Sequence, residues 1–313
     1  MKPNGKVAAA VVLACAVVGC SKRDSQKAKA AEQVQPNAVE ASNASAKATD
    51  GEGFVGTPPL SISGPVSFAD GEAAYQTRNY GEATKLFEQY IARRPDNPWG
   101  HYMLGLSAWK SGDFEKSESG FENALRLDPK HMKSLVNLSR VLIEQKRYDD
   151  AIVKLTVAGE VDPESANVQR LMARAYGAKG EFESAVDAYR RAIAIDGSDA
   201  WSMNNLGLLY LEQGFVEDAL PYLAKAVMMK EEVAAFHNNL GMALEHQGRF
   251  VAAATAYKGA LAADPGYKKA AQNLVRVAAV KSGPEEPLDV AALARETDED
   301  RTVASDETVA AKQ

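Results

Sequence analysis

The sequence predicts an all-α solenoid of six 34-residue helix pairs, followed by one helix that caps the last pair. Two passages, residues 204–207 and 238–241, both read Asn-Asn-Leu-Gly and lie 34 residues apart. A fixed interval of this length indicates stacked units that cannot bury their apolar faces alone. Apolar residues make up 46% of the chain but aromatic residues only 7%. That balance, with abundant alanine, favours closely packed helices.

The first 19 residues are predicted to be a signal peptide. Lys2 and Lys6 precede an uncharged apolar run over residues 7–18. This run is shorter than the roughly 20 residues that a membrane-spanning helix needs, and it is typical of an export signal. The run ends in Val-Val-Gly-Cys at residues 17–20, which resembles the lipobox of bacterial lipoproteins.

The lipobox resemblance implies that Cys20 becomes the mature N-terminus and carries a diacylglycerol and a further acyl chain such as palmitate. Two or more acyl chains anchor a protein firmly, whereas one chain binds marginally. Ser21 is not the aspartate that favours inner-membrane retention in such lipoproteins, so we expect an outer-membrane anchor facing the periplasm. The alternative is an ordinary cleaved signal with its site at Ala28-Lys29-Ala30.

Residues 20–66 are predicted to be the lipidated N-terminus and a disordered linker. Residues 21–66 are rich in Ala, Ser, Lys, Gln and Asn, with five basic and five acidic side chains. Such a composition cannot bury enough apolar surface to fold. A flexible coil of this length spans about 40 Å. The GxGxxG match at residues 51–56 has no preceding strand or following helix, so we expect no nucleotide site and no cofactor.

Three positions of the 34-residue unit carry the expected packing. Position 8 is small in every unit (Gly71, Gly105, Ser139, Ala173, Gly207 and Gly241), and so is position 20 (Ala83, Ser117, Ala151, Ala185, Ala219 and Ala253). Position 24 is large: Phe87, Phe121, Leu155, Tyr189, Leu223 and Tyr257. Small residues let two helices approach closely, and the large side chain fills the space between them.

The pattern resembles the tetratricopeptide repeat (TPR), which has a 34-residue unit with Gly or Ala at fixed positions and a proline at its end. The resemblance covers about residues 64–267 and implies a right-handed solenoid over residues 67–281, which ends in a capping helix near residues 267–281. In proteins of this family an extended peptide binds in the concave groove.

The sequence contains no constellation typical of catalysis. The net charge is −6 and the pI is near 5.4, which argues against nucleic-acid binding. No Cys or His pair has metal-ligand spacing, and His101 and His237 occupy position 4, a packing position. We therefore expect no enzyme activity, no metal site and no small-molecule substrate.

The face opposite the packing positions supplies the candidate binding residues. On a helical wheel, positions 2, 5, 9, 12 and 13 lie away from the core arc. They carry aromatic residues at one end of the predicted groove and cations in its middle: Trp99, Tyr102, Trp109, Arg140, Arg170, Arg174, Asn204 and Asn238. The alternative for the three arginines is an ordinary solvated face.

Position 6 holds an asparagine in four units: Asn137, Asn205, Asn239 and Asn273. Asparagine is unfavourable inside a helix, and its amide both donates and accepts hydrogen bonds. One hypothesis, supported by the asparagine ladders of other TPR superhelices, is that these amides grip a peptide backbone. The alternative is that they bond neighbouring helices and set the repeat spacing.

Residues 282–313 carry nine acidic side chains against three basic ones. This composition predicts a disordered acidic tail, with a possible short helix at residues 290–295. Its charge also suggests that it folds back into the cationic groove.

The predicted function is a membrane-anchored scaffold that binds extended peptides or helices of other envelope proteins. The combination of a lipobox with six repeats resembles pilotin-type and pilus-assembly lipoproteins. The alternative resembles lipoprotein adaptors that recruit cell-wall hydrolases or proteases.

Overall fold

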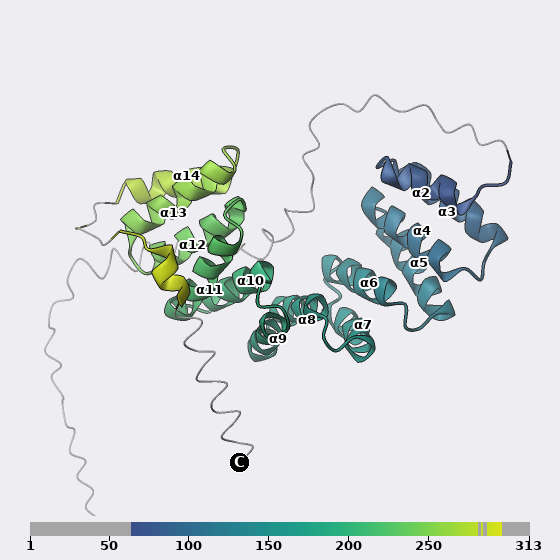
Figure 1. The fold of residues 1–313 in the computed structure, drawn as a ribbon, viewed down its shortest axis with the longest axis horizontal. Coiled ribbons are helices and arrows are strands. Elements are labelled where there is room, and N and C mark those ends of the chain that lie inside the picture. The colour runs from purple at the N-terminus through teal and green to yellow at the C-terminus, as the bar shows by residue number, and fades with distance from the viewer. Residues whose placement is uncertain (1–63, 281–282, 284–286, 296–313) are drawn as a thin grey trace, which may run out of the picture. The chain divides into compact units, whose positions relative to one another are not determined.

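The computed structural model describes residues 64–280, 283 and 287–295 of the 313-residue chain. The predicted signal peptide, Cys20, most of the linker, and residues 296–313 lie outside the described residues. Within the described part the chain forms helices and turns, with no strand (Figure 1). None of its helices is long and apolar enough to cross a membrane.

The helices form six consecutive pairs and a final helix, which confirms the predicted fold class. The pairs are α2 (Phe68–Gln76) and α3 (Tyr80–Arg93), α4 (Pro98–Ser111) and α5 (Phe114–Leu127), α6 (Met132–Glu144) and α7 (Tyr148–Val161), α8 (Ala166–Lys179) and α9 (Phe182–Ile195), α10 (Ala200–Glu212) and α11 (Val216–Met229), and α12 (Ala234–His246) and α13 (Phe250–Ala263), followed by α14 (Lys268–Ala278).

Side-chain caps mark where several of these helices begin. Ser67 and Asp70 form a capping box at the start of α2. Asn97, followed by Pro98 at the first helical position, accepts from the Gly100 N–H, and Asp113 accepts from the Lys116 N–H. Each oxygen satisfies an amide that has no partner inside its own helix.

The turn inside each pair also follows the 34-residue interval. The residue there has a positive φ angle in all six pairs: Arg78, Gly112, Lys146, Gly180, Gly214 and Gly248. Four of the six are glycine, the residue that adopts this conformation at no steric cost. The turn conformation is therefore kept even where the side chain disfavours it.

Within a pair, the small residue at position 8 lies directly under the large side chain at position 24. A Cβ atom added to Gly71 would lie 2.7 Å from the Phe87 ring, and one added to Gly241 would lie 2.6 Å from the Tyr257 ring. Phe87 and Tyr257 are themselves fully buried. The two helices of a pair can therefore approach this closely only when position 8 is small.

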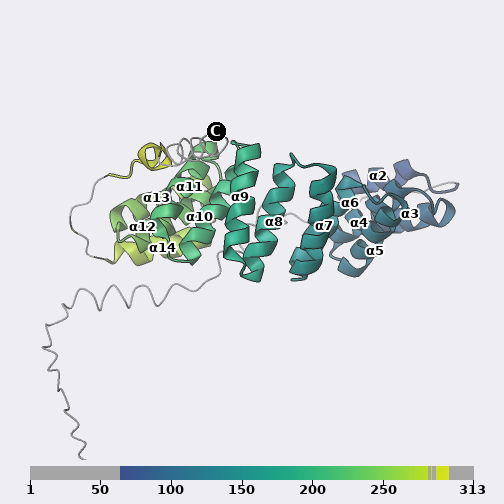
Figure 2. The same ribbon diagram turned by 90° about the horizontal axis from the view of Figure 1, so that it is seen from below.

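The pairs stack so that each helix packs on the next and the first helices of neighbouring pairs also touch. Contacts join α4 to α6, α6 to α8, α10 to α12 and α12 to α14. The largest apolar cluster extends from α8 to α14, a second from α4 to α8, and a third joins α2, α3 and α4. Figure 2 shows α7, α8 and α9 side by side.

A short helical segment at residues 290–295 lies within the stretch for which the sequence predicts an acidic disordered tail. Ala294 is 5% exposed, and Leu288, Val290 and Leu293 pack against the largest apolar cluster. These apolar residues give the segment a surface to bury, although the surrounding stretch of sequence is acidic.

We expect Gly241→Ala to lower the free energy of unfolding by about 1–3 kcal/mol, because its methyl group would overlap the Tyr257 ring. Urea unfolding of the full chain measures this change. Gly81→Ala in α3 is the matched control, since no heavy atom lies within 4 Å of its added Cβ. Equal destabilisation by both substitutions would contradict the packing argument.

Candidate functional site

The first helices of the pairs present a continuous surface that we call the first-helix face. In α4, α6 and α8 its side chains recur at three- and four-residue spacing, which keeps them on one side of each helix. They are Trp99, Tyr102, Lys133, Asn137, Arg140, Asn167, Arg170 and Arg174. The first-helix face therefore has an aromatic region on α4 and a cationic region on α6 and α8.

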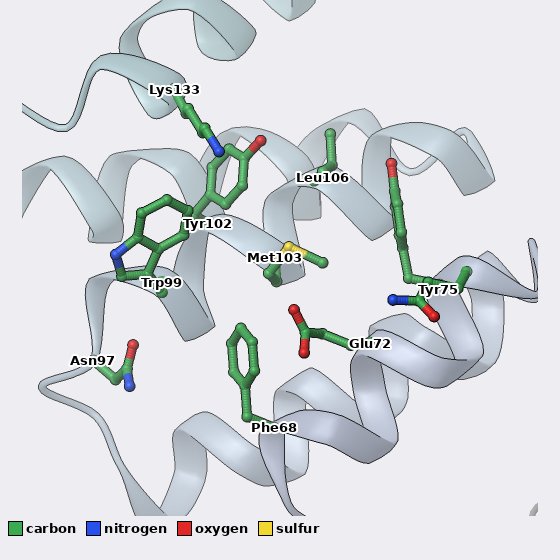
Figure 3. Close-up of a pocket in the computed structure, with 10 residues that line it drawn as sticks. Phe68, Glu72, Tyr75, Asn97, Trp99, Tyr102, Met103, Leu106 and Lys133 are labelled. Carbon is green, nitrogen blue, oxygen red and sulfur yellow. The ribbon is translucent and has the colours of Figure 1, made fainter.

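The aromatic region contains a pocket of about 620 Å³ between α2, α4 and the start of α6. It is lined mainly by Phe68, Tyr75, Trp99, Tyr102, Met103 and Leu106, with Glu72 and Lys133 as its charged members (Figure 3). Trp99 is 45% exposed, and the Lys133 ammonium lies 5.0 Å from the centre of its ring. An exposed indole beside apolar walls is typical of a surface that binds another molecule.

His131 supports the pocket from behind. Its ring packs edge-on against Trp99 at 4.7 Å and against Tyr102 at 5.3 Å between centroids. Its Nδ1 lies 2.7 Å from the Ser134 hydroxyl, and its buried Nε2 has no hydrogen-bond partner among the described residues. Burial lowers the pKa of His131, so the ring is neutral at pH 7 and packs as an aromatic side chain.

Three arginines from α6 and α8 make up the cationic region. The Asn167 side-chain oxygen accepts from Arg140 at 3.2 Å and from Arg170 at 3.0 Å, while Arg170 also pairs with the buried Asp199 at 2.6 Å. Burial lowers the pKa of Arg140, and the charges of Arg170 and Arg174 lower it further. Burial and Arg170 also lower the pKa of Arg174. The guanidiniums are therefore half-buried and close enough to repel one another, unlike the solvated face considered from the sequence.

The asparagines do not lie on an open groove, as the first hypothesis required. Asn204, Asn238 and Asn239 are each 2% exposed and Asn205 is 8% exposed. Their amides form one directional chain, in which Asn273 donates to Asn238, Asn238 to Asn239, Asn239 to Asn204, and Asn204 to Asn205. The alternative fits the four buried asparagines, because the chain of bonds joins α10 to α12 and α12 to α14 and leaves them almost no surface to offer a peptide. Asn137 and Asn273 are half-buried.

Hydrogen bonds across 35 residues recur along the first helices. Asn239 donates to Asn204 at 2.8 Å, Asn273 to Asn238 at 3.0 Å, and Asn137 to the Tyr102 hydroxyl at 3.2 Å. Each joins position 6 of one unit to position 5 of the unit before it. Trp109 makes a further bond across 35 residues, in which its indole N–H donates to Glu144 at 3.1 Å.

The sequence reasoning missed several residues that build the pocket. Phe68, Glu72 and Tyr75 lie four and three residues apart in α2, so they share one helix face, and that spacing was the available signal. The expectation that His101 and His237 are structural is confirmed: Nε2 of His101 bonds the Pro95 backbone oxygen, and Nε2 of His237 bonds that of Glu231. The described residues hold no group of three or more His, Cys, Asp or Glu suited to a metal ion.

Asn239→Ala should lower the free energy of unfolding by about 1–3 kcal/mol, because it leaves the buried oxygen of Asn204 without its donor. Thermal and urea unfolding measure the loss. Asn123→Ala is the control, since that exposed amide bonds only within its own helix. No difference between the two variants would show that the amide chain does not hold the repeats together.

Acidification from pH 7 to pH 5 should destabilise the wild-type protein more than the His131→Asn variant. The folded state holds the pKa of His131 below its ordinary 6.5, so the unfolded chain takes up a proton first and gains relative stability as the pH falls below 6.5. The lowered pKa values of Asp70 and Asp196 act below their ordinary 3.8, outside this window. Parallel curves of unfolding free energy against pH would contradict the expected burial.

Known proteins resemble this chain over most of its described helices. Family profiles match the middle TPR-like domain of cilia and flagella-associated protein 70 over residues 67–185, a TPR repeat over residues 173–214 and a tetratricopeptide repeat over residues 204–268. The three matches together follow the chain from α2 into α14.

Curated relatives match at low identity over about half of the chain. The human cell division cycle protein 16 homolog is 24% identical over 163 residues, which are 49% of this chain and 26% of that protein. Cellulose synthase operon protein C of Xanthomonas axonopodis pv. citri is 27% identical over 184 residues, or 56% of this chain and 12% of that protein. The chain thus spans only about a quarter or less of these relatives.

Solved structures show the same fold. A tetratricopeptide repeat protein from Parabacteroides merdae superposes with a TM-score of 0.55 at 17% identity, over 67% of this chain and 82% of that one. The structure of the APC/C hetero-tetramer Cut9-Hcn1 superposes with a TM-score of 0.56 at 17% identity, over 67% of this chain and 41% of that one. Family profiles thus match tetratricopeptide repeats over residues 67–268, and these structures show the same helical-pair fold.

Proposed function

We propose that the chain is a lipid-anchored scaffold of the bacterial envelope that binds segments of partner proteins on its first-helix face. The observation that carries this proposal is the pocket beside the exposed Trp99, which has Lys133 of α6 in its lining; Arg140 follows Lys133 on the same helix. Both regions belong to helices whose spacing is set by the repeat, so they are held in place before a partner arrives. Such preorganisation reduces the entropy cost of binding.

The partner segment is extended, because the available surface crosses several helices instead of filling one closed cavity. A single side chain can enter the pocket at α2 and α4, while the flanking backbone runs along α6 to the cations that lie beside α8. The first helices touch one another along this path. An ordered helical row suits a ligand that contacts successive units in turn.

The anchor rests on the residues at the start of the chain. The apolar run at 7–18 and Val-Val-Gly-Cys at 17–20 support export followed by lipidation of Cys20. The lipid chains would hold the protein at the membrane without a spanning helix. For a protein anchored at this location, the first proposed partners are components of secretion or pilus assembly. Cell-wall hydrolases or proteases are the alternative partners.

Partner binding is tested by co-purification with the affinity-tagged full chain from envelope extracts. The double variant Trp99→Ala/Arg140→Gln should lose the bound proteins, because it removes the exposed indole and one cation of the face. The matched control Phe114→Ala/Arg126→Gln changes an exposed aromatic residue and an exposed arginine of α5 and should retain them.

The proteins identified in this experiment also separate the partner classes. Secretin or pilus components support the assembly role, and hydrolases or proteases support the adaptor role. Equal retention by the two double variants would refute binding on the first-helix face.

Cys20→Ser should shift the protein from the membrane pellet to the soluble fraction or stall its processing, because serine lacks the thiol that accepts the lipid. Fractionation, together with labelling by radioactive palmitate, measures both effects. Cys15→Ser provides the control within the same apolar run. Unchanged membrane association and labelling of the Cys20→Ser variant would rule out the proposed anchor.

A further inference from the structure

We infer that the first-helix face selects partner segments that carry an apolar or aromatic anchor residue and a carboxylate three or four positions away. This inference rests on the proposed function and specifies the chemistry of its ligand. The anchor enters the pocket beside Trp99, and the carboxylate meets Arg140 at the edge of the cationic region.

The pocket accepts an apolar side chain because its walls are aromatic and aliphatic. Phe68, Trp99, Met103 and Leu106 line it (Figure 3), and its volume of about 620 Å³ exceeds that of any single side chain. Burying a side chain of the size of Leu or Phe against such walls removes apolar surface from water and is favourable. The anchor residue of the partner therefore supplies affinity, whereas the contact of the partner's carboxylate with Arg140 of α6 supplies selectivity.

Arg140 is the cation best placed to receive a carboxylate. The one hydrogen bond that the structure shows for its guanidinium goes to the neutral amide oxygen of Asn167, which Arg170 shares. Arg170, in contrast, already pairs with Asp199. A carboxylate brought to Arg140 would form a charge-assisted hydrogen bond and would offset the repulsion from Arg170 and Arg174.

The spacing between anchor and carboxylate follows from α6. Lys133 lines the pocket, and Arg140 follows it by seven residues on the same helix. Seven residues of α-helix rise about 10 Å, and an extended chain covers about 3.3 Å per residue. A segment lying along α6 therefore spans the two sites with about three residues.

Asn137 lies between the two sites and leaves this path open. Its amide donates to the Tyr102 hydroxyl, which holds both side chains against the helices. The Lys133 ammonium lies over the Trp99 ring and adds a second positive charge at the pocket end. Because Glu72 also lines the pocket, the net positive charge of the path lies at the Arg140 end, and this end favours a carboxylate of the segment over a neutral side chain.

The test is a selection of random dodecapeptides displayed on phage against the immobilised full chain. Enriched sequences should pair an apolar or aromatic residue with Asp or Glu three or four positions away. The most enriched peptide, labelled with fluorescein, is then titrated by fluorescence anisotropy. Arg140→Gln should weaken its binding about tenfold or more, as expected for the loss of a charged hydrogen bond, and Arg126→Gln should leave it unchanged.

Two outcomes separate this inference from the proposed function. Peptides that lose binding in Trp99→Ala but carry no acidic residue, or that bind Arg140→Gln as tightly as wild type, overturn the inference and leave the scaffold function standing. If neither Trp99→Ala nor Arg140→Gln alters the binding of any enriched peptide, both fall. Circular dichroism melts of each variant verify that it is folded.

The acidic residues 296–313 of the chain itself are the competing occupant. Peptide binding that is detected only after these residues are removed would overturn the assignment to a separate partner. Equal affinity with and without them supports it. Replacing the peptide's acidic residue by Lys should abolish its binding to the wild-type protein.

Discussion

The close approach of two helices at position 8 is the constraint on which the rest of the structure depends. A residue no larger than alanine or serine there admits the large side chain of position 24, and in four units even a methyl group would overlap that side chain. Because the contact recurs every 34 residues, each pair has nearly the same geometry. The first helices therefore form a regular row, and side chains far apart in the sequence lie beside one another.

A second layer of interactions, the hydrogen bonds across 35 residues, divides the row into two parts. In α10 and α12 the asparagines of positions 5 and 6 bond one another and are buried, and the half-buried Asn273 of α14 donates to Asn238. In α4, α6 and α8 the polar residues at these positions are Tyr102, Asn137 and Arg170, and the aromatic and cationic surface is partly open. In the half of the chain with the most regular sequence, from α10 on, these polar side chains therefore stabilise the fold. The side chains that remain open to a partner lie in the half from α4 to α8, whose sequence is less regular.

Much of the fold could be predicted, and less of the site. The 34-residue period and the small residues at positions 8 and 20 predict the helix pairs, because packing inside one unit depends on residues close in sequence. The sequence leaves open whether the asparagines lie on an open face or bond neighbouring helices, because a helical wheel describes one helix, whereas Asn239 is buried and bonds Asn204 of the preceding unit. For the same reason the pairing of Arg170 with Asp199 and the support of Trp99 by His131 were not foreseen: both contacts join different units.

Hydrogen–deuterium exchange of the full chain, alone and saturated with a bound peptide, tests the central claim most directly. If the first-helix face is the binding surface, protection will concentrate in α2, α4, α6 and α8, where the open aromatic and cationic side chains lie. The second helices α3, α5 and α7 will exchange at unchanged rates. Protection confined to those second helices, or to α11 and α13, would contradict the claim.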